Sequence, residues 1–216
     1  MQMHIWILIL ITAAGVSYGQ SLPSDIYKDS LSRFPVVKRE QMDDKGKKAY
    51  DVIAGGPGKT VLPTGPAAIG LYSPGVYEPM RMLNDYLRKD SMLGERLGEL
   101  AILVAAREVD EQYVWGAHEP AALKIGISQT VIDAIKYGRE VSGLEEKEAA
   151  IIRFGRQLFR EKKISSDVFA KTVELFGRQG IVELTALMGD YQLDGLLLKM
   201  ADQHLPPDRK ALLPPR

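Results

Sequence analysis

The sequence predicts an all-α fold, a helical bundle without a β-sheet. Two observations support this prediction. Apolar residues recur three or four positions apart through most of the chain after residue 78, and no stretch alternates with a period of two for long enough to form a strand. The 216 residues are 45% hydrophobic, which is enough for a sizeable core in a single domain.

Seven segments show the helical spacing, over residues 78–89, 94–108, 111–125, 128–137, 145–161, 165–176 and 179–203. Ser128 can cap the helix that follows it, and Ser165 opens another segment. Glycines stand where helices are expected to end, at Gly126, Gly138, Gly143 and Gly177.

Proline and glycine punctuate both ends of the helical region. Residues 20–75 contain six prolines and a Gly-Gly-Pro-Gly run at 55–58, which predicts an irregular N-terminal arm with a short helix over 41–53. Residues 209–216 are expected to form an extended tail. The helical domain is therefore predicted to span residues 76–208.

Two short segments of the domain have weakly similar sequences, which is compatible with two related halves. Residues 99–103 read Glu-Leu-Ala-Ile-Leu, and residues 183–187 read Glu-Leu-Thr-Ala-Leu. Chance similarity between two helices rich in leucine and alanine is the alternative.

Residues 1–19 are predicted to be a signal peptide. An apolar run from Ile5 to Val16 precedes small residues at Ser17 and Gly19, as in a secretory cleavage site, although no lysine or arginine precedes the run. The run is too short to span a bilayer, which needs roughly 20 residues. We expect export to the periplasm or secretion after cleavage near Gly19, with no stable membrane insertion; an uncleaved anchor or a buried helix are the alternatives.

Charge and cysteine content exclude several functions. The 28 basic and 28 acidic side chains give a formal net charge of zero, which argues against a nucleic-acid partner, because binding to phosphates depends on clustered positive charge. The chain has no cysteine, so it can form no disulfide, thiolate nucleophile or zinc–thiolate site.

The segment from Glu99 to Gly126 contains the most informative pattern. On a helix that starts at Glu111, steps of three, four and seven residues place Val114, Trp115 and His118 on the same face as Glu111. Glu99 lies on the preceding helix, and antiparallel packing of the two helices would bring it towards His118. A carboxylate and an imidazole in an apolar pocket can form a proton-transfer pair.

Each of these residues also has a structural explanation. A histidine on an apolar helix face can be a hydrogen-bonded core residue, and Trp115 can be part of the core. Glu99 can pair with a base such as Arg107, and Glu111 at a helix start is explained by the helix dipole. The pattern alone therefore leaves the function open.

A resemblance adds to the pattern. The glutamate at 99, the run Gln112-Tyr113-Val114-Trp115-Gly116-Ala117-His118, Ala121 and Gly126-Ile127-Ser128 resemble the signature of the carboxymuconolactone decarboxylase and AhpD-like family. The resemblance implies an all-α AhpD-like helical bundle that assembles as a homotrimer or homohexamer.

The sequence departs from both branches of that family. The AhpD branch has a Cys-x-x-Cys pair seven and four positions before the histidine, where this chain has Glu111 and Val114. We therefore expect no thiol peroxidase chemistry, because no nucleophilic sulfur is present. The decarboxylase branch has a glutamate at the position of Val114, and Glu111 supplies a carboxylate one helical turn earlier.

The resemblance implies a lyase or isomerase that acts on a small organic acid or lactone. His118 would be the acid or base, Glu99 would orient it, and Glu111 would handle a proton. Tyr113, Val114 and Trp115 would contact the substrate, and Arg107 would bind its carboxylate, with Arg81 as a weaker candidate. We expect no cofactor.

Two alternatives remain. The first is a non-catalytic helical oligomer whose pocket, lined by Trp115 and Tyr113, binds a small apolar ligand. The second is metal-dependent hydrolysis by Glu99, Glu111, His118 and His204. Because Glu111 and His118 are seven positions apart rather than four, we expect no metal site.

Overall fold

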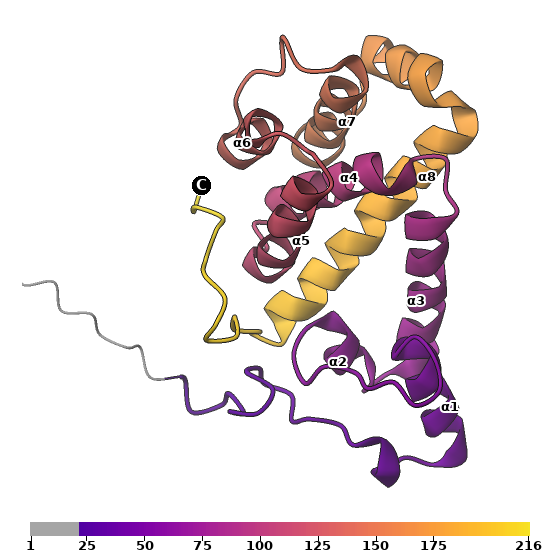
Figure 1. The fold of residues 1–216 in the computed structure, drawn as a ribbon, viewed down its shortest axis with the longest axis vertical. Helices are drawn as coiled ribbons and strands as arrows, with labels where there is room; N and C mark the ends of the chain where they lie inside the picture. Colours follow the sequence, from indigo (N-terminus) through magenta and orange to yellow (C-terminus); the bar gives the residue numbers. More distant parts are fainter. Residues whose placement is uncertain (1–21) are drawn as a thin grey trace, which may run out of the picture.

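The computed structural model describes residues 22–216, so the predicted signal peptide lies outside the described residues. Within these residues, eight α-helices follow one another: α1 (Asp44–Ile53), α2 (Pro66–Gly70), α3 (Pro74–Lys89), α4 (Gly94–Glu108), α5 (Gln112–Lys124), α6 (Gln129–Tyr137), α7 (Glu146–Arg156) and α8 (Ser166–Met200) (Figure 1). Over residues 22–216 no strand forms, and the prediction of an all-α fold is confirmed.

Local chemistry sets the helix boundaries that the sequence indicated. The Ser128 side chain accepts a hydrogen bond from the backbone N–H of Val131 at the start of α6, and Gly138 ends that helix in the left-handed conformation. Ser165 caps α8 in the same way. Gly177 has φ 68° and ψ 176°, so α8 is broken there into the two segments that the sequence predicted.

Helix α4 lies at the centre of the bundle and packs against α3, α5, α6, α7 and α8. Its residues from Leu100 to Ala106 are almost completely buried on every side. Close packing requires a glycine in α7, because a Cβ atom at Gly155 would lie 2.3 Å from Cγ1 of Val104. The segment that contains Glu99 therefore lies in the closely packed, buried centre of the bundle.

The N-terminal arm packs against the end of α8 and is not free in solvent. The backbone N–H of Arg33 donates to the Ala201 carbonyl at 2.7 Å, and that of His204 donates to the Leu31 carbonyl at 2.8 Å. Further along the arm, α1 and α2 form a small second core with α3 around Tyr50. The arm therefore supplies one wall of the region between α2, α3 and α8.

The two similar segments begin with Glu99 on α4 and Glu183 on α8. Both glutamates are buried, and their helices pack against each other. Glu183 accepts hydrogen bonds from the Tyr86 hydroxyl and the backbone N–H of Met92. Glu99 has different partners, described below. The relation between two halves stays a prediction.

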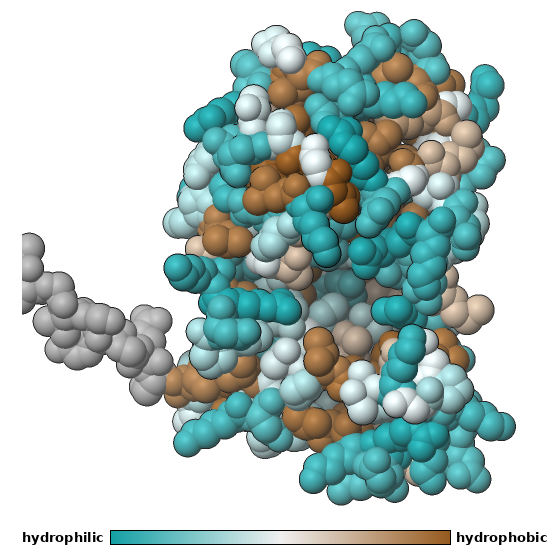
Figure 2. All heavy atoms as spheres, in the orientation of Figure 1, coloured by the Kyte–Doolittle hydropathy of each residue, from teal (hydrophilic) through white to brown (hydrophobic). Residues whose placement is uncertain are grey.

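On the face drawn in Figure 2, hydrophilic side chains surround several separate apolar patches. Between residues 22 and 216, no helix combines the length and apolar character that crossing a bilayer requires.

Candidate active site

Glu99 and His118 form the centre of the candidate site. The chain turns between α4 and α5 at Asp110, which has a φ of 49°, and the two helices then pack against each other. Nδ1 of His118 lies 2.5 Å from Oε1 of Glu99. The structure thus brings together the carboxylate and imidazole that the sequence placed on adjacent helices.

The surroundings hold this pair in one orientation. Glu99 is buried in α4, and the His118 side chain is only 14% exposed. The ring of Tyr191 on α8 packs edge-on against the imidazole, with a centroid distance of 5.1 Å and an interplanar angle of 90°. On its other side, Glu99 lies 3.7 Å from a guanidinium nitrogen of Arg88 on α3. His118 therefore has one ring nitrogen bound to Glu99, and its rotation is restricted.

His118 lines a cavity of about 210 Å³ between α2, α3, α5 and α8. The cavity is smaller than pockets for drug-sized molecules, which have roughly 300–1,000 Å³. Its lining consists of Pro66, Ala67, Tyr77, Met80, Arg81, Asn84, Arg88, Tyr113, Val114, Ala117, His118, Asp190, Tyr191 and Asp194. A small polar or charged molecule fits this lining better than a large apolar one.

Helix α8 contributes two carboxyl groups to the cavity, Asp190 and Asp194, which are one helical turn apart. Asp190 accepts a hydrogen bond of 2.8 Å from the Asn84 amide, and the Tyr77 hydroxyl lies 3.5 Å from Asp194. Burial, together with the charge of Asp190, raises the pKa of Asp194 to about 7. Burial also raises the pKa of Asp190 and that of Tyr77.

Helix α3 contributes two cations. Arg81 pairs through one terminal nitrogen with Asp85, at 3.1 Å, and Arg88 approaches Glu99. The Nε atom of Arg81 is buried and has no hydrogen-bond partner among the described residues. Because Arg81 and Arg88 both line the cavity, an anionic ligand there would meet two guanidinium groups.

Tyr113 and Val114 line the cavity as the sequence predicted, but Trp115 does not. Trp115 is completely buried, and its indole N–H donates to Glu119, which also binds Lys136 at 2.6 Å. One position along a helix is a rotation of about 100°. That rotation turns Trp115 into the core, away from the cavity face of Val114.

Glu111 lies at the start of α5 and not in the cavity lining. Its carboxylate accepts a hydrogen bond of 2.9 Å from the backbone N–H of Tyr113, and its side chain packs close to Gly195. Burial raises its pKa, and the bond from Tyr113 partly offsets this effect. The structure therefore shows the capping position that was the alternative explanation for Glu111.

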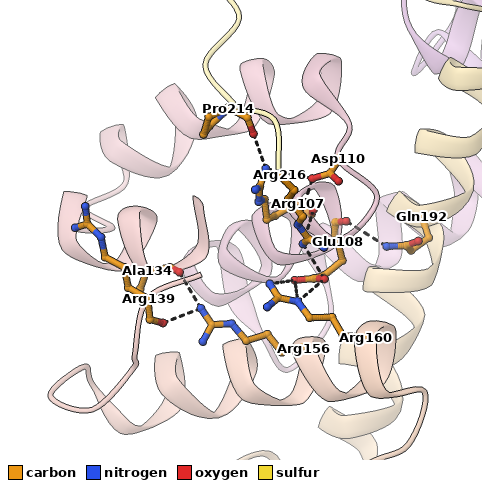
Figure 3. Close-up of polar contacts among 11 residues, drawn as sticks. Arg107, Glu108, Asp110, Ala134, Arg139, Arg156, Arg160, Gln192, Pro214 and Arg216 are labelled. Carbon is orange, nitrogen blue, oxygen red and sulfur yellow. Dashed lines mark hydrogen bonds and ion pairs between the residues drawn. The ribbon is translucent and has the colours of Figure 1, made fainter. Parts of the chain in front are cut away.

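Arg107 is also outside the cavity. It donates to the Pro214 carbonyl at 2.8 Å and pairs with Asp110 at 3.1 Å, in a cluster with the C-terminal tail (Figure 3). Arg107 is eight positions after Glu99, which is about 12 Å along a helix axis. Arg107 is therefore too far along α4 to reach a substrate beside His118. The arginines that line the cavity with His118 are Arg81 and Arg88.

The sequence analysis did not identify seven cavity residues from α3 and α8: Tyr77, Met80, Asn84, Arg88, Asp190, Tyr191 and Asp194. A signal for two of them was present, because Asp190 and Asp194 are four positions apart, and therefore on one helix face, in a segment rich in leucine. Their position opposite α3 depends on tertiary packing. Within residues 22–216, no three potential metal-ligating side chains gather into a site.

Comparison with known proteins supports the fold. No family model and no curated protein matches the sequence. Among solved structures, one similar chain is an Agrobacterium tumefaciens protein of unknown function, assigned provisionally as the antioxidant defence protein AhpD; it is 19% identical, with a TM-score of 0.57 over 64% of this chain and 96% of that one. Another is an uncharacterized peroxidase-related protein from Ralstonia eutropha JMP134, described as an alkylhydroperoxidase AhpD core. It is 16% identical, with a TM-score of 0.61 over 82% of this chain and 94% of that one.

The protein has the AhpD-like fold. This agrees with the fold that the signature around His118 implied. At 16–19% identity the likeness extends to the fold alone, so the chemistry has to be argued from the cavity itself.

Proposed function

We propose that the protein is an acid–base enzyme, a lyase or isomerase in the manner of a carboxymuconolactone decarboxylase, and that it acts on a small organic acid or lactone. The observation that supports this proposal is the buried hydrogen bond between Glu99 and His118 at the wall of a cavity. With Nδ1–H donating to the Glu99 carboxylate, Nε2 is the ring nitrogen left to exchange a proton with a substrate.

The charges of the cavity support an acid as the substrate. Arg81 and Arg88 both line it, and Arg81 has an unpaired buried N–H. A guanidinium binds a carboxylate through charge-assisted hydrogen bonds. A substrate carboxylate at Arg81 would place the rest of a small molecule within the same cavity as His118.

The proposed chemistry does not use a thiol. Both similar structures are named as antioxidant or peroxidase-related proteins, but this chain has no cysteine. Thiol-dependent peroxidase chemistry needs a sulfur nucleophile. Proton transfer by His118 needs none, and all the groups for it are present.

The alternative of a module that binds an apolar ligand has less support. Trp115, which was to line the apolar pocket, is in the core, and the cavity presents two arginines and two aspartates. An apolar ligand would displace water from these polar side chains without offering them hydrogen bonds in return.

The test is a screen of lactones, β-keto acids and vinylogous acids for carbon dioxide release and for proton exchange in D₂O. We expect turnover of at least one compound by the wild type, and a loss of roughly 100-fold or more in His118→Ala, the range typical of general acid–base catalysis. His204→Ala is the matched control, because His204 is outside the cavity. Full turnover in His118→Ala would contradict the proposal.

We further propose that the protein is exported after cleavage near Gly19. N-terminal sequencing of the protein purified from its own host tests this proposal. A mature chain that begins near Gln20 would agree with it, and a chain that begins at Met1 would contradict it.

A further inference from the structure

The cavity contains a second set of proton-handling groups, on a different wall from His118. Asp190 and Asp194 project into it from α8 and are both less than a tenth exposed. Asp190 has a hydrogen bond from Asn84, whereas the one hydrogen bond to the Asp194 side chain among the described residues is a long one from the Tyr77 hydroxyl, at 3.5 Å. Two buried carboxyl groups one turn apart disfavour simultaneous ionisation.

The neighbouring charges do not neutralise this pair. The ionisable groups facing the cavity are Tyr77, Arg81 and Arg88 from α3, Glu99 from α4 behind His118, Tyr113 and His118 from α5, and Asp190, Tyr191 and Asp194 from α8. Arg81 attracts the ionised form of Asp194, but burial and the charge of Asp190 outweigh this attraction. The Arg81 guanidinium already pairs with Asp85.

We propose that Asp194, held beside Asp190, donates a proton to a carbonyl oxygen of the substrate, and that the substrate is a small carboxylic acid carrying such an oxygen. The proposal rests on the proposed function, because it needs His118 as the group that exchanges a proton with carbon. Arg81 would bind a carboxylate, Asp194 would bind the carbonyl oxygen, and His118 would reach the carbon between them.

The proton balance of a decarboxylation fits these two groups. As the bond between the carboxyl carbon and the α-carbon breaks, its electron pair moves towards the carbonyl oxygen, which takes the proton from Asp194 and becomes an enol. His118 in its protonated form then gives a proton to the α-carbon, and the enol proton returns to Asp194. Carbon dioxide leaves, and His118 regains one proton from solvent. In an isomerisation, His118 removes and returns a carbon-bound proton. Asp194 again donates a proton to the carbonyl oxygen and takes it back.

The first experiment needs no substrate. The aspartate side chains are labelled with ¹³C at the carboxyl carbon, and their titration is followed by NMR in the full-length protein. We expect one carboxyl group to titrate near pH 7, the step to disappear in Asp194→Asn, and its midpoint to fall in Asp190→Asn. Glu174→Gln, on an exposed part of the same helix, is the control and should leave the step unchanged.

Two results of the titration would overturn the proposal. One is that every aspartate of the wild type completes its titration below about pH 5, as ordinary carboxyl groups do. The other is that the step near neutral pH persists in Asp194→Asn. Circular dichroism on each variant checks that the fold is retained.

The second experiment separates this proposal from the proposed function. On an acid that the wild type converts, we expect Asp194→Asn to lower kcat by roughly 100-fold or more and to remove the part of the fall in rate near pH 7 that the Asp194 carboxyl group causes. If His118→Ala is inactive while Asp194→Asn retains the wild-type rate and pH profile, the role of Asp194 is wrong and the proposed function stands. If the wild type converts no compound in the panel, the proposed function fails and the donor role fails with it, whatever the titration shows.

Discussion

Nδ1 of His118 lies 2.5 Å from Oε1 of Glu99, and this bond connects α5 to the completely buried centre of α4. The carboxylate selects which ring nitrogen carries the proton and fixes the direction of the other. An imidazole bound in this way is oriented before any substrate arrives, which favours proton transfer at a defined point of the cavity.

The first prediction concerns this positioning role of Glu99. Glu99→Gln keeps the size of the side chain but removes the charge that stabilises a protonated imidazole. We expect kcat on a converted acid to fall roughly 100-fold, with a smaller change in KM. Steady-state kinetics measure both. Glu95→Gln, on the exposed start of α4, should keep the wild-type values, and equal behaviour of the two variants would refute the role of Glu99.

The second prediction links Asp194 to stability. Its pKa is raised from 3.8 to about 7 in the folded protein, so the folded state binds the proton more tightly than the unfolded state. The stability gained from this proton is fully present below about pH 4 and is lost as pH rises through 7. We therefore expect Asp194→Asn to be more stable than the wild type at pH 8, by up to about 4 kcal/mol, and to lose this advantage towards pH 4.

Urea unfolding of both proteins between pH 4 and pH 8 measures the difference. Asp133→Asn, on α6 and outside the cavity, is the control. A difference between Asp194→Asn and the wild type that is independent of pH would show that the carboxyl group is ionised throughout this range.

The third prediction concerns the C-terminal tail, which Gln112 holds against α5. The Gln112 amide oxygen accepts from the backbone N–H groups of Leu212 and Leu213, and its NH₂ group donates to the Leu213 carbonyl, all within 2.9 Å. Arg216 adds an ion pair with the buried Glu108 (Figure 3). We expect Gln112→Ala to lower the free energy of unfolding by about 1–3 kcal/mol.

Hydrogen exchange should show the cause of this loss. In Gln112→Ala, the amides of Leu212 and Leu213 should exchange faster, while those at the centre of α4 should be unchanged. Gln129→Ala, which removes a side chain that donates to the half-buried Asp133 on the same helix, should have wild-type exchange in the tail. Unchanged protection of Leu212 and Leu213 would show that the tail is held without Gln112.

The fourth prediction tests the homotrimer or homohexamer that the resemblance implies. After Gly177, α8 exposes Val182, Leu193, Leu196 and Met200, which recur at the spacing of one helix face. We expect this face to contact a second copy of the chain, because burying it removes apolar surface from water. Leu196→Glu should therefore reduce the assembly to smaller species in size-exclusion chromatography with light scattering.

Phe169→Glu is the matched control for this experiment. Phe169 is an exposed apolar residue on the first part of α8, before the break at Gly177. A wild-type protein that is already monomeric would refute the expected assembly, and an unchanged oligomer in Leu196→Glu would refute the choice of interface.

Much of the fold could be predicted because the signals for it are local. Helix spacing, serine caps and terminal glycines act within a few residues, so the boundaries at Ser128, Gly138 and Gly177 agree with the structure. The Glu99–His118 pair could be predicted for a similar reason, because two adjacent helices joined by a short turn usually pack antiparallel. The sequence by itself determined these features, together with the absence of cysteine.

Only the tertiary structure decided which other groups share the cavity with His118. Arg81 and Asp194 are far apart in the chain, and their meeting depends on how α3 crosses α8. The same packing places Arg107 against the C-terminal tail and Trp115 in the core, although both residues lie close to His118 in sequence. Helical periodicity identifies the buried face of a helix, but the neighbour that covers this face is set by the packing of the whole bundle.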